Sequence, residues 1–307
     1  MKEKAIKRSY FKTQTGDRIF AFVLLLPAII TTVGFILIPV ADSIYRSFFD
    51  YKVKNIISGK PGVWNDFANY TKLFSNGKLV PSMTNTLVFV FGVVAAQFVL
   101  GMALALILNS NIRFSRFIRS IMMVPWVVPT LISGLVWLWM FQPQYGLVKY
   151  FAGVLTGGRV TDLAVLNNPS TAMLGVSAAA LWKQIPLAAL LLLAGLANVP
   201  EEILEAAKID GANGVQRFFN IVLPYMKSVI KVTVSMSIIE NFKQFPLFWT
   251  MTGGGPNNST TTMAILSYRE AFVSNNFGSG AAVTTVWMLL MIVVVYVYNR
   301  IFRADDM

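Results

Sequence analysis

Three polar side chains with complementary hydrogen-bonding chemistry recur at helical spacing inside an apolar segment of this chain. Ser237, Asn241 and Gln244 lie at positions i, i+4 and i+7, so they share one face of a helix. Hydroxyl and amide groups donate and accept hydrogen bonds, which suits a hydroxyl-rich ligand. The same groups also join helices in membrane bundles, so the pattern alone leaves both roles open. Glu240 and Lys243 flank the stripe.

Several kinds of chemistry are excluded by composition. Cysteine and histidine are both absent, which removes thiol nucleophiles, Cys/His zinc sites and histidine acid–base catalysis. No Gly-x4-Gly-Lys-Ser/Thr loop is present, so ATP hydrolysis by this chain is not expected. The net charge is +12 at pH 7, but the basic residues are spread over termini and loops. That distribution favours anionic lipid head groups over nucleic acid as the electrostatic partner.

The chain is too apolar for a soluble domain. It is 55% hydrophobic and 13% charged, whereas a soluble domain has about 25% charged residues. A spanning helix needs roughly 20 mostly apolar residues. The sequence therefore predicts an all-α membrane protein with six transmembrane helices and an uncleaved first span. The expected spans are 19–41, 81–108, 121–141, 171–197, 225–245 and 279–302.

The distribution of Lys and Arg predicts the orientation of these spans. The N-terminal segment 1–18 and the loop 109–120 are basic, and both lie on one side of a six-span chain. We therefore expect both termini in the cytoplasm, with a six-span domain at 19–302 and a cytoplasmic tail at 303–307. Basic residues in the predicted outer loop 42–80 dilute this bias. The other predicted outer loops are 142–170 and 246–278.

A polar hairpin, residues 199–224, separates the fourth and fifth expected spans. Pro200 and the acidic residues after it favour a helix start, and the segment 201–209 is expected to be helical. Gly211 can end that helix and Asn213 can cap a second one. By these features alone, the hairpin could simply join two spans at the membrane surface.

The residues of this hairpin resemble a known motif. Glu205-Ala206-Ala207, Gly211 and Ile221-x-Leu223-Pro224 are similar to the cytoplasmic coupling loop of ATP-binding-cassette (ABC) importer permeases. The resemblance extends over nearly the whole chain, and it is closest to permease subunits of carbohydrate importers of the maltose and oligosaccharide type. The further segments that carry it are Leu24-x2-Pro27, Pro125-Trp126-x2-Pro129, Gly253-Gly254-Gly255-Pro256 and Tyr268-Arg269-Glu270-Ala271-Phe272.

The resemblance implies a transport subunit with the type I importer permease fold. It implies a heterodimer with a second homologous permease, two cytoplasmic ATPase subunits and an extracytoplasmic sugar-binding protein, in a bacterial or archaeal cytoplasmic membrane. ATP and Mg would be bound by the ATPases, and this chain would bind no cofactor or metal and would not be an enzyme. By analogy, the hairpin docks on an ATPase through Glu205, Ala206, Ala207, Asp210 and Gly211.

The resemblance also implies positions for sugar contacts. The matching positions are Lys183, Gln184, Leu187, Ser237, Asn241 and Gln244. Lys183 and Gln184 depart from the smaller or apolar residues typical of maltose carriers. Lys183 would then either favour an acidic or differently branched saccharide or pair with Glu240. By chemistry, Trp126, Trp137 and Trp182 could stack on sugar rings, although aromatics at span ends also serve as interface anchors.

The predicted function is the permease of an ATP-driven, binding-protein-dependent importer for a sugar, most readily an oligosaccharide. One alternative is a secondary transporter driven by an ion gradient, but Glu240 is the single plausible intramembrane carboxylate and no inverted repeat is apparent. A membrane-embedded enzyme is disfavoured by the lack of clustered acids within the spans. A non-sugar cargo such as glycerol phosphate is the alternative within the same importer class.

Overall fold

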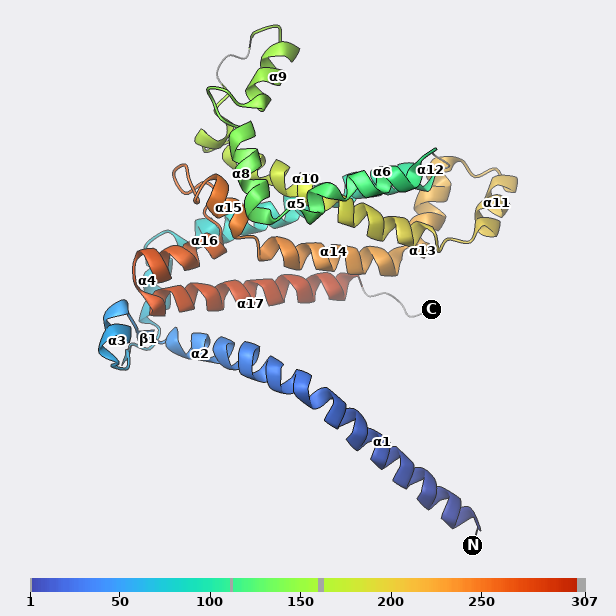
Figure 1. Cartoon of the computed structure of the whole chain (residues 1–307), viewed down its shortest axis with the longest axis horizontal. Coiled ribbons are helices and arrows are strands. Elements are labelled where there is room, and N and C mark those ends of the chain that lie inside the picture. The colour runs from blue at the N-terminus through green and yellow to red at the C-terminus, as the bar shows by residue number, and fades with distance from the viewer. Residues whose placement is uncertain (1, 111–112, 160–162, 303–307) are drawn as a thin grey trace.

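The computed structural model describes residues 2–110, 113–159 and 163–302, with side chains from residue 17 onward. Within them the chain is a bundle of helices with one small two-stranded antiparallel sheet (Figure 1). The elements in order are α1 (Lys2–Thr32), η1 (Val33–Leu37), α2 (Ile38–Arg46), β1 (Phe49–Asp50), α3 (Val53–Ser58), β2 (Val63–Trp64), α4 (Ala68–Ser75), α5 (Leu79–Asn109), α6 (Ser115–Met122), α7 (Val124–Val127), α8 (Thr130–Met140), α9 (Leu147–Leu155), η2 (Val165–Asn167), α10 (Ala172–Leu196), α11 (Glu201–Ile209), α12 (Gly214–Arg217), η3 (Phe218–Val222), α13 (Leu223–Tyr225), α14 (Lys227–Phe242), α15 (Pro246–Met251), α16 (Met263–Tyr268), η4 (Arg269–Val273) and α17 (Phe277–Ile301).

Four helical stretches in the described residues are long and apolar enough to cross a membrane on their own. They are Asp17–Arg46, which runs through α1, η1 and α2, and the single helices α5, α10 and α17. Two further candidates are broken rather than straight. The pair Ser115–Val127 and Thr130–Met140 is bent by 92°, and the pair Gly214–Tyr225 and Lys227–Phe242 by 73°. The chain therefore has four candidate spans, or up to six if each bent pair is one span.

The first break has a local cause in the sequence. Pro129 has no backbone N–H, and a residue that precedes proline is driven out of the helical region. Val128 accordingly has φ −60° and ψ 131°, and Pro129 has φ −54° and ψ 138°. Two extended residues thus separate α7 from α8 within the stretch that the sequence predicted as one span.

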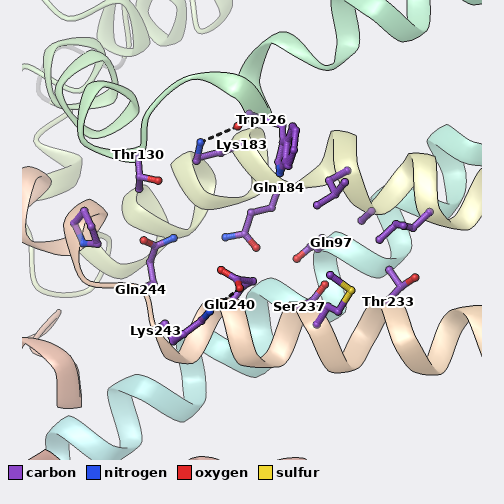
Figure 2. A pocket seen from close by; sticks show the side chains of 15 residues that line it. Gln97, Trp126, Thr130, Lys183, Gln184, Thr233, Ser237, Glu240, Lys243 and Gln244 are labelled. Carbon is purple, nitrogen blue, oxygen red and sulfur yellow. Dashed lines mark hydrogen bonds and ion pairs between the residues drawn. The ribbon is translucent and has the colours of Figure 1, made fainter. Parts of the chain in front are cut away.

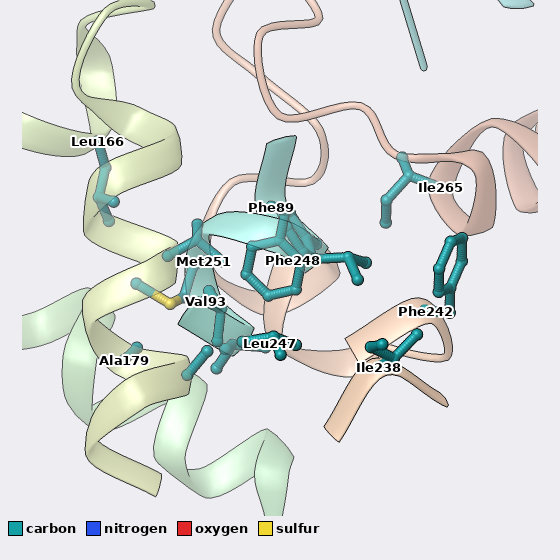
Figure 3. Close-up of a cluster of buried hydrophobic side chains, with 14 of the residues drawn as sticks. Phe89, Val93, Leu166, Ala179, Ile238, Phe242, Leu247, Phe248, Met251 and Ile265 are labelled. Atoms are coloured by element: carbon teal, nitrogen blue, oxygen red, sulfur yellow. The ribbon is translucent and has the colours of Figure 1, made fainter. Parts of the chain in front are cut away.

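The core lies where α5, α10 and α14 meet the short helix α15. Phe89, Val93, Ala179, Phe242 and Phe248 belong to its largest cluster of buried side chains (Figure 3). Side chains of Phe89 and Phe248 meet edge to face, with ring centroids 4.7 Å apart. This cluster holds α14 against the α5–α10 pair, and so fixes the wall on which the polar stripe lies.

Helices α5 and α10 approach each other closely at a glycine. A Cβ atom added at Gly101 would lie 3.3 Å from the Cβ of Ala188 and 3.5 Å from the backbone nitrogen of Ala189. Small residues at a crossing let two backbones come together, which is a common way of packing membrane helices. The crossing sets the spacing between α5 and α10.

The predicted outer loops carry structure of their own. In the first, β1 pairs with β2, and Asn69 of α4 donates to the carbonyls of Ser47 and Phe49 at 2.8 and 2.9 Å. In the last, the guanidinium of Arg269 donates to Gly253 O at 2.6 Å and to Asn258 Oδ1 at 2.7 Å. This pair of contacts joins the two segments that carried the family resemblance in this part of the sequence.

Candidate functional site

A polar pocket lies between α10 and α14, beside the break that separates α7 from α8 (Figure 2). Its volume is about 580 Å³. Such a volume falls within the roughly 300–1,000 Å³ of small-molecule sites. The lining residues come from six helices and from the segment between α14 and α15: Gln97, Trp126, Thr130, Lys183, Gln184, Leu187, Ala188, Leu191, Thr233, Met236, Ser237, Glu240, Lys243, Gln244 and Pro246.

An amide pair ties α10 to α14 at the pocket wall. Gln184 Nε2 donates to Asn241 Oδ1 at 3.1 Å, and Asn241 Nδ2 donates to Gln184 Oε1 at 2.9 Å. Asn241 Nδ2 also donates to the backbone carbonyl of Ser237 at 2.9 Å. Asn241 is 2% exposed and lies behind Gln184. The pair orients Gln184, which faces the pocket.

Lys183 lines the pocket next to the break between α7 and α8. Its ammonium group donates to the backbone carbonyl of Trp126 at 3.0 Å and to that of Val128. These carbonyls stand where the helix stops, so they lack the N–H partners that a continuous helix would supply. Lys183 therefore replaces helical hydrogen bonds at the bend while its charge stays at the pocket.

Glu240 pairs with Lys243 one turn away rather than with Lys183. The Lys243 Nζ to Glu240 Oε1 distance is 2.7 Å, and both side chains are more than half exposed. The sequence left open whether Lys183 pairs with Glu240, and the structure places no ion pair between them. In the described part of the chain, no cluster of three acidic residues could hold a metal ion.

Gln97 adds an unsatisfied polar atom to the pocket. It lies on α5, is 5% exposed, and its Oε1 atom has no hydrogen-bond partner among the described residues. A buried carbonyl oxygen without a partner carries a desolvation cost that a donor on a ligand would remove. Sequence reasoning missed Gln97, although an amide in an otherwise apolar segment is the signal that would have found it.

Five of the six predicted sugar-contact residues line this pocket: Lys183, Gln184, Leu187, Ser237 and Gln244. The sixth, Asn241, is adjacent but turned toward Gln184. Whether any of them contacts cargo stays a prediction. Thr130 and Thr233 line the pocket too and were not foreseen.

The three tryptophan candidates are distributed differently. Trp126 lines the pocket. Trp137 packs on the core cluster and meets Trp182 at a centroid distance of 6.1 Å. Neither Trp137 nor Trp182 belongs to the pocket lining, so Trp126 is the aromatic placed to meet a ligand there.

The polar hairpin has the helix–turn–helix geometry that its sequence predicted. Helix α11 ends in a two-bond motif: Gly211 N–H donates to Lys208 O at 3.1 Å, and Ala212 N–H donates to Ala207 O at 2.9 Å. Gly211 has φ +80°, a region that favours glycine. The Asn213 side chain then caps α12 by accepting a hydrogen bond from the backbone N–H of Gln216. Glu205, Ala206, Asp210 and Gly211 are exposed on this hairpin, and Ala207 is partly so.

Comparison with known protein families decides the class of this molecule. Residues 97–305 match the family model described as the binding-protein-dependent transport system inner membrane component. The chain belongs to this family. The resemblance predicted from the hairpin motif is thereby confirmed, and the apolar helices are those of a multi-pass membrane permease. The matched range includes the bent pair around α7 and α8, the pocket and the polar hairpin.

Curated relatives of this permease cover nearly all of its length. It is 33% identical over 99% of its chain, and 97% of the relative, to the sulfoquinovosyl glycerol transport system permease protein SmoG of Agrobacterium fabrum. Over 92% of the chain, and 94% of the relative, it is 32% identical to the trehalose/maltose transport system permease protein MalF of Thermococcus litoralis. It is also 33% identical, over 88% of the chain and 90% of the relative, to the sn-glycerol-3-phosphate transport system permease protein UgpA of Pectobacterium atrosepticum.

Solved structures with the same fold include a bacterial ABC transporter involved in the import of the acidic polysaccharide alginate. The TM-score is 0.79 at 19% sequence identity, with 97% of the permease and 99% of that chain covered. The fold of this permease is therefore that of an ABC transporter subunit.

Proposed function

We propose that this permease is the membrane subunit of an ATP-driven, binding-protein-dependent importer for a sugar or a sugar-like polyol. The observation that carries the proposal is the pocket of hydroxyl, amide and lysine groups between α10 and α14, in a chain of the transport family. The relatives named above carry sulfoquinovosyl glycerol, trehalose or maltose, and sn-glycerol 3-phosphate. Those cargoes share a polyhydroxylated skeleton.

The pocket chemistry matches such a skeleton. Gln184, Gln244 and Ser237 offer groups that both donate and accept. A sugar hydroxyl donates and accepts at once, so it can satisfy these groups in place of water. Trp126 supplies an apolar face on which a sugar ring can stack. An oligosaccharide is the finer form of this proposal.

Energy would enter through the hairpin between α10 and α14. It presents the acidic residues Glu205 and Asp210 together with Ile209, whose side chain is 87% exposed. We assign this surface to a cytoplasmic ATPase that binds ATP and Mg, and the second permease would complete the pathway across the pocket.

The arrangement of elements supports an orientation. Figure 1 shows the hairpin around α11 and the end of α17 at one end of the bundle, with α3 and α4 at the other. With six spans, the hairpin and both termini lie in the cytoplasm. The segments around α4, α9 and α16 would face the extracytoplasmic binding protein. Movement of the two permeases by alternating access would then expose the pocket to each side in turn.

Purification of the affinity-tagged chain from its native membrane tests the proposal. Mass spectrometry should find a second permease and an ATPase with a phosphate-binding loop. Proteoliposomes with these subunits should take up cargo when ATP is enclosed and the binding protein is supplied outside. Transport driven by a proton or sodium gradient without ATP would instead establish the secondary-transporter alternative.

A further inference from the structure

The pocket between α10 and α14 carries an excess of positive charge. Two lysines and one glutamate are its ionisable lining residues: Lys183, Lys243 and Glu240. The carboxylate of Glu240 is paired with Lys243 at 2.7 Å. Lys183 has no carboxylate partner among the described residues, so the pocket as a whole holds one uncompensated cation.

The ammonium group of Lys183 is held in place by neutral groups. The backbone carbonyls of Trp126 and Val128 accept two of its three N–H bonds. Backbone carbonyls orient a cation without cancelling its charge, and they remove the rotational freedom that a free lysine would lose on binding a ligand. One N–H bond is left for a ligand in the pocket that Lys183 lines together with Gln184 and Gln244 (Figure 2).

We propose that the cargo of this permease carries an anionic group, a carboxylate, sulfonate or phosphate, and that Lys183 binds it. This inference rests on the proposed function, since it names the chemical class of the cargo in the same pocket. The neutral lining groups Gln184, Ser237 and Gln244 would hold the hydroxyls of the same molecule. The cation selects the charged end, and the amides and the hydroxyl recognise the polyol.

A purely structural role for Lys183 makes a different prediction. If the lysine only completes hydrogen bonds at the bend, a neutral donor in its place should serve nearly as well. Glutamine keeps an N–H donor at this position and removes the charge, whereas arginine keeps both. Comparison of Lys183→Gln with Lys183→Arg therefore separates charge from bend support.

Thiol labelling measures the charge of the pocket directly, because the chain contains no cysteine. Leu187→Cys places a thiol on the pocket wall, one helical turn after Lys183 on the same face of α10. Its reaction rate is measured with a sulfonate-bearing and with a trimethylammonium-bearing methanethiosulfonate in the purified, membrane-reconstituted complex. Lys183→Gln should lower the sulfonate-to-ammonium rate ratio about tenfold, because the reagents differ by two charges.

Two control variants sharpen this measurement. Lys183→Arg should keep the parental ratio. Lys231→Gln removes the same charge from a lysine of α14 that is outside the pocket lining, and it should change the ratio less than twofold. An unchanged ratio in Lys183→Gln would overturn the proposal. That result would leave the proposed transport function standing, since the labelling does not depend on transport.

Ligand binding provides the second test. Sulfoquinovosyl glycerol and glucosyl glycerol differ by a sulfonate in place of a hydroxyl, and their affinities for the reconstituted complex are compared by titration calorimetry without the binding protein. The sulfonate should bind at least tenfold more tightly, and Lys183→Gln should abolish that difference. Equal affinities, or no binding of either compound, would count against an anionic cargo. Co-purification without any ATPase would instead refute the importer function itself.

Discussion

The side-chain amides of Gln184 and Asn241 are joined by two reciprocal hydrogen bonds, with nitrogen–oxygen distances of 3.1 and 2.9 Å. The pair bridges α10 and α14 directly behind the pocket wall. Each amide donates one hydrogen bond to the other and accepts one from it. Asn241 is almost fully buried, so its function is to hold Gln184 in position rather than to face the cavity.

Asn241→Leu should therefore weaken the bundle and release Gln184. The loss of folding free energy should be about 0.5–1.5 kcal/mol, because the hydrogen bonds between the two helices are lost while the partly exposed Gln184 amide can bond to water instead. In a double-mutant cycle with Gln184→Leu, the coupling energy should be about 0.5–1.7 kcal/mol, the range for hydrogen bonds between membrane helices. Thermal unfolding in detergent measures both quantities. A coupling energy near zero would show that the two amides act independently.

Gly211 should be intolerant of branched side chains for backbone reasons alone. It has φ +80°, and no atom lies within 4 Å of the position that a Cβ would occupy. Gly211→Val should destabilise the end of α11 by about 1–2 kcal/mol, because a branched residue is strained at positive φ. Gly211→Asn should cost less, because asparagine tolerates the left-handed region.

We expect Gly211→Val to uncouple ATP hydrolysis from transport while the protein still inserts into the membrane. ATPase activity and cargo uptake are measured together on the reconstituted complex, with Gly211→Asn as the control. Parental uptake by the valine variant, with normal ATPase association, would remove the hairpin from the proposed coupling path.

Gly101 should mark the tightest approach of α5 to α10. Gly101→Leu places a large side chain where a Cβ alone would lie 3.3 Å from Ala188, so it should cost about 1–3 kcal/mol or prevent assembly. Gly92→Leu is the matched control, since it lies on the same helix with no atom within 4 Å of a Cβ. Folded yield and thermal stability compare the two. Equal destabilisation would show that the close approach of α5 to α10 at Gly101 is not its cause.

Arg269 should fasten the loop that contains Gly253. The planar guanidinium reaches Gly253 O and Asn258 Oδ1 at once, which a lysine ammonium cannot reproduce in the same geometry. Arg269→Lys should therefore raise hydrogen exchange in residues 253–261. Arg300→Lys, at the far end of α17, is the control. Unchanged exchange in the Arg269 variant would show that Thr260 and Thr261, which bond to the carbonyls of Gly255 and Gly254, suffice to hold the loop.

Local signals in the sequence predicted local structure well. The hairpin was foreseeable because the stop at Gly211 and the cap at Asn213 depend only on neighbouring residues. The polar stripe in 225–245 was visible from helical spacing, and its residues Ser237 and Gln244 do line the pocket.

Relationships between distant segments were not foreseeable. Helical spacing predicted that Asn241 shares a face with Ser237. It could not predict that the Asn241 amide would hydrogen-bond to Gln184, 57 positions earlier. The expected third span, 121–141, contains two prolines, yet composition cannot say that the chain turns by 92° there. The partners of Lys183 are backbone carbonyls, which no pattern of side chains reveals.

The break between α7 and α8 places main-chain oxygens at the pocket, and no amino-acid substitution removes them, because every residue carries a backbone carbonyl. Mutation can replace Lys183, but the carbonyls of Trp126 and Val128 would persist and would then be free to accept from a sugar hydroxyl. A single codon change thus separates a charge-selective pocket from a neutral one. Related importers could therefore change between acidic and uncharged cargo by one substitution at position 183, without any change in the backbone of this break.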